Sequence, residues 1–178
     1  MKVLVTGATG FIGSHIADQM KEKGADVICI VRKTSNLRWV ENKGYSLVEA
    51  SLSDIESLKE VVKDVDIIFH SAGLTAANSM EDFVRANLTG TKNLFEAAKY
   101  TAPNLQRFLH VSSQTAVGPS VSLDEISTEE QAQNPLTSYG KSKKMAEDYL
   151  KASQDILPIT IVRPPAVYGP RDTATLPM

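Results

Sequence analysis

Apolar residues along this chain follow two periodicities that alternate from end to end. Six short runs, apolar almost throughout and mostly rich in β-branched residues, predict buried strands at residues 2–6, 26–31, 45–50, 65–73, 106–113 and 157–165. Between them, apolar residues recur at helical spacing over residues 11–24, 36–44, 55–64, 80–101 and 138–153. This alternation predicts an α/β fold, a doubly wound parallel sheet covered by helices on both faces.

Composition fits one such domain, taken to span residues 1–178. Hydrophobic residues make up 42% and charged residues 22% of the sequence, an ordinary balance for a soluble globular protein. The net charge of -2 gives no reason to expect a nucleic acid or an anionic membrane as partner. The N-terminal apolar run is too short for a signal peptide, and no run approaches membrane-spanning length. The single cysteine, Cys29, lies in an apolar run, so a reducing, cytoplasmic location is expected.

A glycine-rich turn joins the first predicted strand to the first predicted helix. Gly7, Gly10 and Gly13 lie in the stretch TGATGFIG, spaced more widely at the front than the common dinucleotide fingerprint. Backbone N–H groups at such a helix N-terminus, with the helix dipole, bind the pyrophosphate of a dinucleotide. A plain tight turn is the alternative, but the position after the first strand favours the dinucleotide site.

The residues that follow the second strand bear on which dinucleotide is bound. An acidic residue there would bind the adenosine 2′-hydroxyl and favour NAD. This chain has Arg32 and Lys33 instead, and a pair of cations suits the 2′-phosphate of NADP. NADP is therefore the expected cofactor and NAD the alternative, while two ordinary surface cations are the other interpretation.

Residues 118–135 form one long polar insertion directly after a predicted strand, where α/β folds place their ligands. His70 and His110 both end buried strands, and no metal-ligand spacing links them. We therefore expect ordinary hydrogen-bonded histidines and no metal site. Tyr139 and Lys143 stand four residues apart on the last predicted helix, a pair that is unremarkable in isolation.

Six stretches of the chain, from Val5 to Arg171, indicate a function for Tyr139 and Lys143. In order they are TGATGFIG, FHSAG, NLTGTKNLFEAA, HVSSQTAVG, YGKSK and RPPAVYGPR. Together they resemble the extended branch of the short-chain dehydrogenase/reductase superfamily, the NAD(P)-dependent epimerase/dehydratase family. Each stretch alone is weak evidence, whereas all six in this order are specific. The resemblance implies a Rossmann-type dinucleotide-binding fold and oxidoreductase chemistry.

The resemblance also assigns roles residue by residue. Ser113, five residues before Gly118, matches the family's catalytic Ser or Thr, and Tyr139 and Lys143 match its catalytic Tyr-x-x-x-Lys pair. Asn87 is similar to the Asn of the long helix that braces the family's site. The implied cofactor-binding residues are Gly7, Thr9, Gly10, Phe11, Ile12, Gly13, Arg32, Lys33, Ser51, Leu52, Ser71, Ala72, Gly73, Asn87, Tyr139, Lys143, Pro164 and Val167.

Two positions depart from the family's pattern. Ser51 stands where the family commonly has an Asp near the adenine amino group. Val117 stands where many members have a Tyr close to the substrate.

Hydride transfer at a carbinol carbon requires a proton to move on its oxygen. An unperturbed Tyr has a pKa near ~10, too high for an efficient base at neutral pH. A cation such as Lys143, one helical turn from Tyr139, is expected to lower that pKa, a change worth roughly 10²–10⁴-fold in rate. Ser113 would hold the same substrate oxygen, and in the family the matching Lys also binds the nicotinamide ribose.

The expected function is NAD(P)-dependent epimerase/dehydratase chemistry on a nucleotide-sugar. Two alternatives stay open: an NADPH-dependent carbonyl reductase or hydroxysteroid-type dehydrogenase, and a non-catalytic dinucleotide-binding module. Family members usually continue beyond the RPPAVYGPR stretch, so this chain is expected to lack most of the C-terminal substrate lobe. The resemblance further implies a homodimer through the helices that begin near Met80 and Tyr139.

Overall fold

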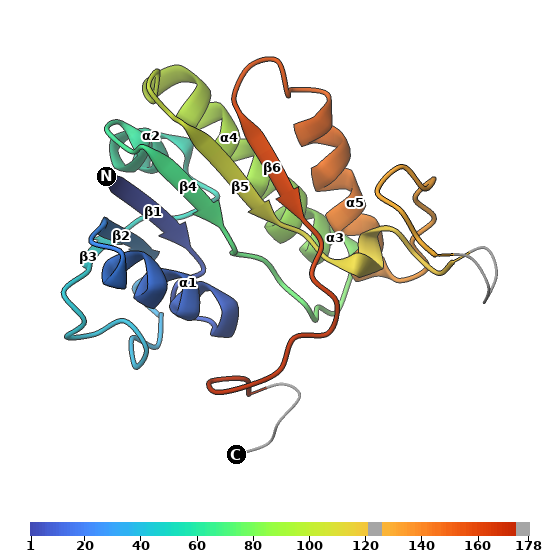
Figure 1. Cartoon of the computed structure of the whole chain (residues 1–178), viewed down its shortest axis with the longest axis horizontal. Coiled ribbons are helices and arrows are strands. Elements are labelled where there is room, and N and C mark those ends of the chain that lie inside the picture. Colours follow the sequence, from blue (N-terminus) through green and yellow to red (C-terminus); the bar gives the residue numbers. More distant parts are fainter. Residues whose placement is uncertain (121–125, 174–178) are drawn as a thin grey trace.

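The computed structural model describes residues 1–120 and 126–173 of the chain. Within these residues one sheet of six strands forms, in the order β3-β2-β1-β4-β5-β6 (Figure 1). All neighbouring strands are parallel. The strands are β1 Lys2–Thr6, β2 Asp26–Val31, β3 Ser46–Glu49, β4 Ile67–His70, β5 Arg107–Val111 and β6 Ile159–Val162.

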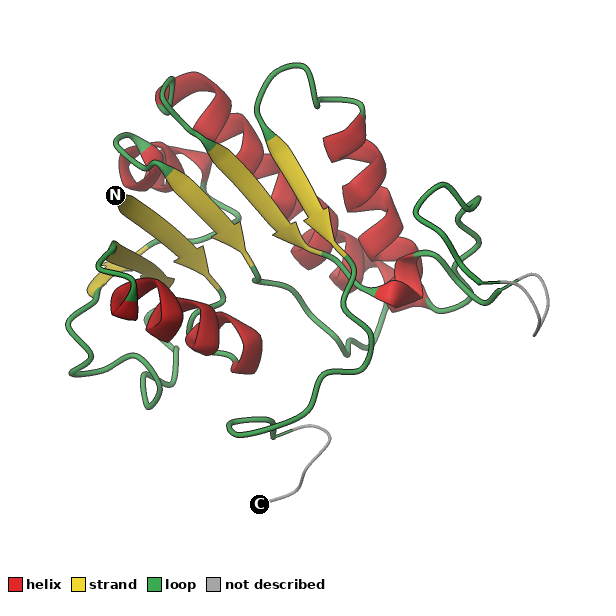
Figure 2. Cartoon of the chain, in the orientation of Figure 1, coloured by secondary structure: helices red, strands yellow, loops and turns green. Residues whose placement is uncertain are grey.

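Helices cover both faces of the sheet. Figure 2 shows α1 (Phe11–Glu22) on one face and the other long helices on the opposite face. The remaining helical segments are α2 Ile55–Val62, α3 Met80–Phe83, the π-helix η1 Val84–Thr89, α4 Gly90–Thr101, the 3-10 turn η2 Gln114–Ala116 and α5 Ser138–Lys151. The predicted doubly wound parallel sheet is therefore confirmed.

Two apolar cores hold the helices on the sheet. The larger one lies beneath α2, α4 and α5, and its fully buried members include Leu58, Leu94, Phe95, Phe108 and Leu150. The smaller one lies beneath α1 and contains Val3, Val5, Ala17, Val27 and the buried Cys29. Burying each large aliphatic or aromatic side chain contributes about 1.5–3 kcal/mol, so these two layers fix the sheet that carries the loops.

The direction of the crossovers reverses at the centre of the sheet. β1 pairs with β2 on one side and with β4 on the other. A doubly wound sheet binds ligands in the crevice outside the carboxyl ends of its strands, at this switch point. The loops after β1 and β4 are therefore the ones that face a ligand.

The short helix predicted for residues 36–44 does not form. The carbonyl oxygen of Leu37 accepts from the amides of Val40 and Glu41, which closes a single helical turn. Asn42 and Gly44 then have φ angles of 58° and 72°, in the left-handed region. The prediction was wrong because the backbone leaves the right-handed helical region before a second turn can follow.

The long helix predicted for residues 80–101 is present but is not uniform. Ser79 caps its start by accepting from the amide of Asp82. The segment then widens into the π-helix η1 before it continues as α4, and η1 contains Asn87. π-helical turns are rare and often occur at functional sites. Among the described residues no helix is both long and apolar enough to cross a membrane.

Candidate active site

The carboxyl ends of β1, β4, β5 and β6 bring four loops to one edge of the sheet (Figure 1). The amide of Ala72, after β4, donates to Oγ1 of Thr6 at the end of β1 over 3.2 Å. The amide of Gln114, after β5, donates to the carbonyl oxygen of Pro164, after β6, over 3.0 Å. Residues predicted from separate stretches of sequence therefore meet at this edge.

The glycine turn is packed too closely for side chains. Gly7 has a φ angle of 71°, and a Cβ atom there would lie 2.8 Å from the amide nitrogen of Ala72. A Cβ atom on Gly13 would lie 2.2 Å from the carbonyl oxygen of Gly7. Gly10 is the N-cap of α1 and has no side chain to accept from the helix's first amides. The turn thus presents a bare helix N-terminus, which fits the pyrophosphate of a dinucleotide.

Lys143 is a buried lysine, with 3% of its surface exposed, on the second turn of α5. Its ammonium group donates to the carbonyl oxygen of Val111 at the end of β5 over 2.8 Å. Burial lowers the pKa of Lys143 to about 8, and the nearby Glu147 carboxylate opposes that shift. Lys143 is therefore held inside the site and does not belong to a solvated run of lysines.

Tyr139 lies in the first turn of α5, where Thr137 caps the helix by accepting from the amide of Gly140. Burial raises the pKa of Tyr139, while a hydrogen bond with Ser113 works in the opposite direction. In the protein chain alone, the pKa of Tyr139 is thus raised, not lowered as expected from Lys143. The phenol is protonated at neutral pH and is hydrogen-bonded to Ser113, the residue expected to share a substrate oxygen with it.

The two adjacent serines after β5 have different surroundings. Ser112 is 3% exposed, and its hydroxyl donates to the carboxylate of Glu147. Ser113 is only half-buried, and its Oγ accepts from Oγ1 of Thr115 over 2.9 Å while lying near Tyr139. The structure thus distinguishes an inner serine from one that faces the site, in keeping with the choice of Ser113.

Asn87 holds the loop after β4 from the π-helical turn. Its Oδ1 accepts from the amide of Leu74 over 2.7 Å, and its Nδ2 donates to the carbonyl oxygen of the same residue over 3.0 Å. The same Nδ2 also donates to Oγ of Ser142 over 2.9 Å. A Cβ atom on Gly73 would lie 2.9 Å from Oδ1 of Asn87, so glycine is required for this approach. Asn87 thus braces both Gly73 and α5.

His70 and His110 are both fully buried on neighbouring strands, with ring centroids 5.3 Å apart. His70 is hydrogen-bonded through both nitrogens, 2.7 Å from Oγ1 of Thr6 and 2.9 Å from Oγ1 of Thr91. Burial lowers the pKa of His70 to about 3, and burial lowers the pKa of His110 as well. The prediction of a hydrogen-bonded histidine holds for His70, whereas neither ring nitrogen of His110 has a partner among the described residues.

The residues predicted to bind the adenosine part of the dinucleotide follow β2 and β3, and those after β2 are open to water. Arg32 and Lys33 are exposed, and the ammonium group of Lys33 lies 3.6 Å from the carboxylate of Glu49. Oγ of Ser51 lies 2.8 Å from Oγ of Ser53, in the loop that would face adenine. Leu52 packs beneath Gly90 at the start of α4. The cations thus follow β2, and the two serines and Leu52 follow β3.

Known proteins similar to this chain show which family it belongs to. The model of the NAD dependent epimerase/dehydratase family matches residues 3–178. The chain belongs to that family. Among curated relatives, a 4-hydroxy-2-methyl-3-oxo-4-farnesyl-3,4-dihydroquinoline-1-oxide ketoreductase of Stigmatella aurantiaca is 31% identical over 182 residues, covering 99% of this chain and 53% of that protein. A ceramide reductase of Caulobacter vibrioides is 33% identical over 174 residues, covering 98% and 49%.

Solved structures in the epimerase group share this fold. The UDP-glucuronic acid 4-epimerase of Bacillus cereus, determined with UDP-glucuronic acid and NAD, superposes with a TM-score of 0.83 at 28% identity. The match covers 99% of this chain and 60% of that structure. The chain thus spans about half the length of the curated relatives it matches.

The segment after β6 carries Pro164 and Val167, which were predicted to lie near the nicotinamide. Pro164 is half-buried and Val167 is exposed. Further along, Nε2 of His15 on α1 lies 2.9 Å from the carbonyl oxygen of Pro170, and Arg171 donates to the carboxylate of Asp18. The segment that carries Pro164 and Val167 is therefore tied back onto the helix that follows the glycine turn.

Two charged residues of the site were missed at the sequence level. Glu147 is fully buried on α5, and Arg163 forms an ion pair with it over 2.6 Å. A signal was present, because Glu147 continues the inward-facing stripe of Lys143 and Leu150 on α5. Arg163 directly follows β6, but its partner could not be read from spacing, since Glu147 lies 16 positions earlier in the chain.

Proposed function

We propose that the protein carries out NAD(P)-dependent hydride transfer of the epimerase/dehydratase type on a nucleotide-sugar, with Tyr139 as the acid/base. The observation that carries this proposal is the placement of Tyr139 against Ser113 beside the buried Lys143, at the sheet edge that also holds the glycine turn. Such a set positions a substrate oxygen and moves its proton, and a bound nicotinamide supplies the hydride chemistry.

The three side chains have separate tasks in this proposal. Tyr139 is protonated in the chain and donates its proton to a carbonyl oxygen, or removes one from a hydroxyl in the reverse direction. Ser113 hydrogen-bonds the same oxygen and keeps it within reach of the phenol. Lys143, with a pKa of about 8, is largely protonated at neutral pH and favours the phenolate electrostatically.

The glycine turn, with Thr9, Phe11 and Ile12 at the start of α1, would hold the pyrophosphate. The loop of Ser71, Ala72 and Gly73 would lie along the dinucleotide. Arg32 and Lys33 would lie near the adenosine 2′ position, and their exposed positive charge supports NADP over NAD. The described residues hold no cluster of three or more His, Cys, Asp or Glu that could bind a metal ion.

A second candidate is a net NADPH-dependent reductase of a ketone, and two observations favour it. The curated relatives named above are reductases. A pocket of about 270 Å³ is also lined by residues that follow Ser113 and residues that precede Tyr139 in the chain, and none of its lining residues is charged. They are Gln114, Thr115, Gly118, Pro119, Leu136 and Thr137. Such a lining suits the uncharged part of a lipophilic substrate.

The test is to purify the full-length protein and to identify the dinucleotide it retains. Tightly retained NAD with no net redox turnover supports the epimerase, because an epimerase regenerates its cofactor within each cycle. NADPH consumption in the presence of a ketone supports the reductase. An Arg32→Ala variant should lose affinity for NADPH and keep affinity for NADH. A dinucleotide-loaded protein that turns over neither substrate class would favour a non-catalytic binding module.

Three further properties go with this proposal. The substrate is a small molecule, and the protein is cytoplasmic. Two copies associate through the helices that begin at Met80 and Ser138. A monomeric sedimentation profile of the full-length protein would contradict the last of these.

A further inference from the structure

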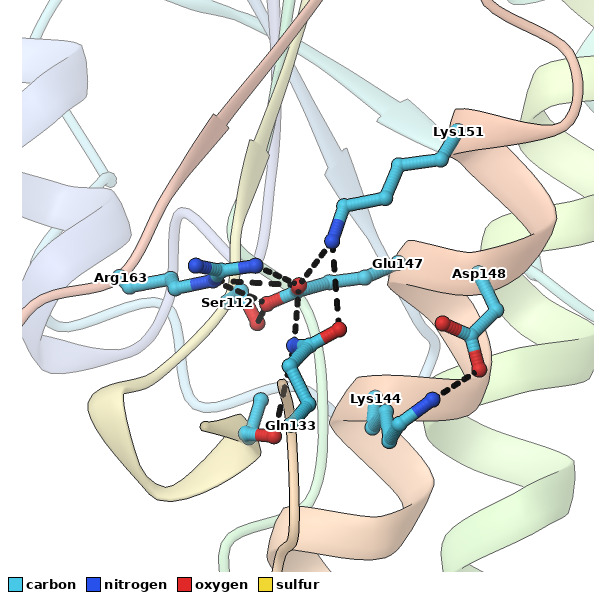
Figure 3. A network of polar contacts seen from close by, with 8 residues as sticks. Ser112, Gln133, Lys144, Glu147, Asp148, Lys151 and Arg163 are labelled. Atoms are coloured by element: carbon cyan, nitrogen blue, oxygen red, sulfur yellow. Dashed lines mark hydrogen bonds and ion pairs between the residues drawn. The ribbon is translucent and has the colours of Figure 1, made fainter. Parts of the chain in front are cut away.

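Glu147 is a fully buried carboxylate at the centre of a polar network behind the candidate active site (Figure 3). Its oxygens accept from the Ser112 hydroxyl, from Nε2 of Gln133 over 2.8 Å, and from Nε and Nη2 of Arg163 over 3.0, 3.1 and 2.6 Å. The ammonium group of Lys151 lies 3.4 Å away. One carboxylate therefore joins four residues that come from three other parts of the chain and from its own helix.

Two of these contacts reach the direct neighbours of site residues. Ser112 directly precedes Ser113, and Arg163 directly precedes Pro164. Glu147 itself lies one helical turn after Lys143 on α5. Gln133 returns from the insertion after η2, and its Nε2 also donates to the carbonyl oxygen of Ala116 over 3.3 Å. The carboxylate is thus tied to every segment that carries catalytic or nicotinamide-side residues.

The charge of Glu147 is retained despite its burial. Burial raises the pKa of this carboxyl group, but hydrogen bonds from Arg163, Ser112 and Gln133 outweigh that effect and the pKa ends below its ordinary value. A buried carboxylate without such partners would be strongly destabilising. An ionised carboxylate that accepts several hydrogen bonds allows its partners only a narrow range of positions, because charge-assisted hydrogen bonds are short and directional.

We propose that Glu147 is a positioning residue, which holds the Ser113 loop, the Lys143 turn of α5 and the Arg163–Pro164 segment in one arrangement. This inference rests on the proposed function, since it assigns Glu147 to the site of Ser113, Tyr139 and Lys143. Glu147 acts through Ser112 and Arg163 and touches no substrate atom.

The same carboxylate also faces the charge of Lys143. The titratable groups that interact electrostatically with that ammonium group are Glu147 on α5, His70 on β4 and His110 on β5. Both histidines are neutral at neutral pH because burial lowers their pKa values. Glu147 is therefore the negative charge that keeps Lys143 protonated, and removing it should move the alkaline limb of the rate profile to lower pH.

Asp148 provides a matched control on the next position of the same helix. Its carboxylate pairs with the ammonium group of Lys144 over 2.7 Å, and Figure 3 shows this pair pointing away from the network. The pair is exposed, with 31% of Lys144 and 51% of Asp148 accessible. Exposed pairs of this kind contribute about 0–1 kcal/mol, so Asp148→Asn should leave both folding and rate nearly unchanged.

The experiment compares Glu147→Gln with Asp148→Asn in the full-length protein, first by amide hydrogen exchange. Exchange of the 112–117 and 163–168 segments should be faster by about tenfold in Glu147→Gln, which corresponds to about 1.4 kcal/mol of local stability. Exchange in α1 should not change. Equal exchange in both variants would overturn the inference whether or not the enzyme is active.

Kinetics then test the link to catalysis. The kcat of Glu147→Gln should fall by up to about 10²-fold, as small misplacements of reacting groups produce, with the dinucleotide Kd nearly constant. The alkaline limb should shift to lower pH, and Glu147→Asp should restore part of the rate. A kcat equal to that of Asp148→Asn would overturn the inference.

If Glu147→Gln does not fold, Ser112→Ala is tested by the same hydrogen-exchange and kinetic measurements, and it leaves no buried cation unpaired. An inactive wild-type enzyme would instead refute the proposed function.

Discussion

The two ends of the candidate cofactor site are built in opposite ways. At the catalytic end, Asn87 and Lys143 have 1% and 3% of their surface exposed, and both are hydrogen-bonded inside the protein. At the adenosine end, Arg32 and Lys33 are exposed, and the exposed fraction of the Lys33 side chain in its pair with Glu49 is 82%. Fixed geometry is needed where a proton and a hydride move, whereas charge in water suffices to select a phosphate.

The largest effect is expected at the catalytic end, from Tyr139→Phe. This change removes the hydroxyl that moves the proton and leaves the ring that lies 6.1 Å from the ring of Phe83. Turnover should fall by about 10²–10⁴-fold while the dinucleotide Kd and the melting temperature hardly change. Steady-state kinetics with an equilibrium binding titration measure both. Turnover near the wild-type value would mean that Tyr139 is not the acid/base.

The glycine turn between the two ends should come next. Gly13→Ala places a methyl group 2.2 Å from the carbonyl oxygen of Gly7, so the turn must shift, at a cost of about 1–3 kcal/mol and with loss of dinucleotide affinity. Gly24→Ala is the control for a methyl group added without crowding, because nothing lies within 4 Å of the Cβ position of Gly24, whose φ is positive at 79°. It should cost about 1–2 kcal/mol and leave affinity intact. Urea unfolding and dinucleotide titration compare the two variants. Equal dinucleotide affinities would contradict a role of the glycine turn in dinucleotide binding.

The buried histidines of the catalytic half make its stability depend on pH. An unfolded histidine titrates near ~6.5, whereas burial lowers the pKa of folded His70 to about 3. The unfolded chain therefore binds more protons in this range, and stability is lost as pH falls from about 6.5 toward 3. Each such histidine contributes a slope of about 1.4 kcal/mol per pH unit.

His110→Leu isolates one of these slopes, because His110 has no hydrogen-bond partner among the described residues. Between about pH 6 and about pH 5, just below the ordinary histidine pKa, the unfolding free energy should depend less steeply on pH. The slope should decrease by about 1.4 kcal/mol per pH unit. Stability at neutral pH should stay the same or rise, since an unpaired polar group is replaced by an apolar one. Urea unfolding across pH gives the slope, and an unchanged slope would count against a neutral buried His110.

The smallest effect on stability is expected at the adenosine end. Lys33→Ala breaks an exposed pair and should change the unfolding free energy by about 0.5 kcal/mol or less. Its NADPH affinity should fall and that effect should weaken as salt rises, while NADH affinity stays constant. Titrations at low and high salt measure this. Equal losses for both dinucleotides would indicate that Lys33 does not face the 2′ position.

Much of this organisation could be predicted from the sequence, because strands, helices and the glycine turn are set by local patterns. The six parallel strands and the meeting of Ser113 with Tyr139 followed from such patterns and from family motifs. The turns at residues 36–44 could not, since positive φ at Asn42 is a local choice that apolar spacing does not encode. The buried Glu147–Arg163 pair depends on tertiary contacts, and so does the raised pKa of Tyr139, which burial dominates.

The most direct test of the central claim measures the ionisation of Tyr139 itself. The near-ultraviolet absorbance of tyrosinate is followed against pH for the wild type and for Tyr139→Phe, each with and without oxidised dinucleotide, and the difference isolates Tyr139. With oxidised dinucleotide, the positive charge of the nicotinamide should add to that of Lys143 and lower the pKa of Tyr139 from its raised value in the chain alone. A Tyr139 titration that does not move when the dinucleotide binds would contradict the account.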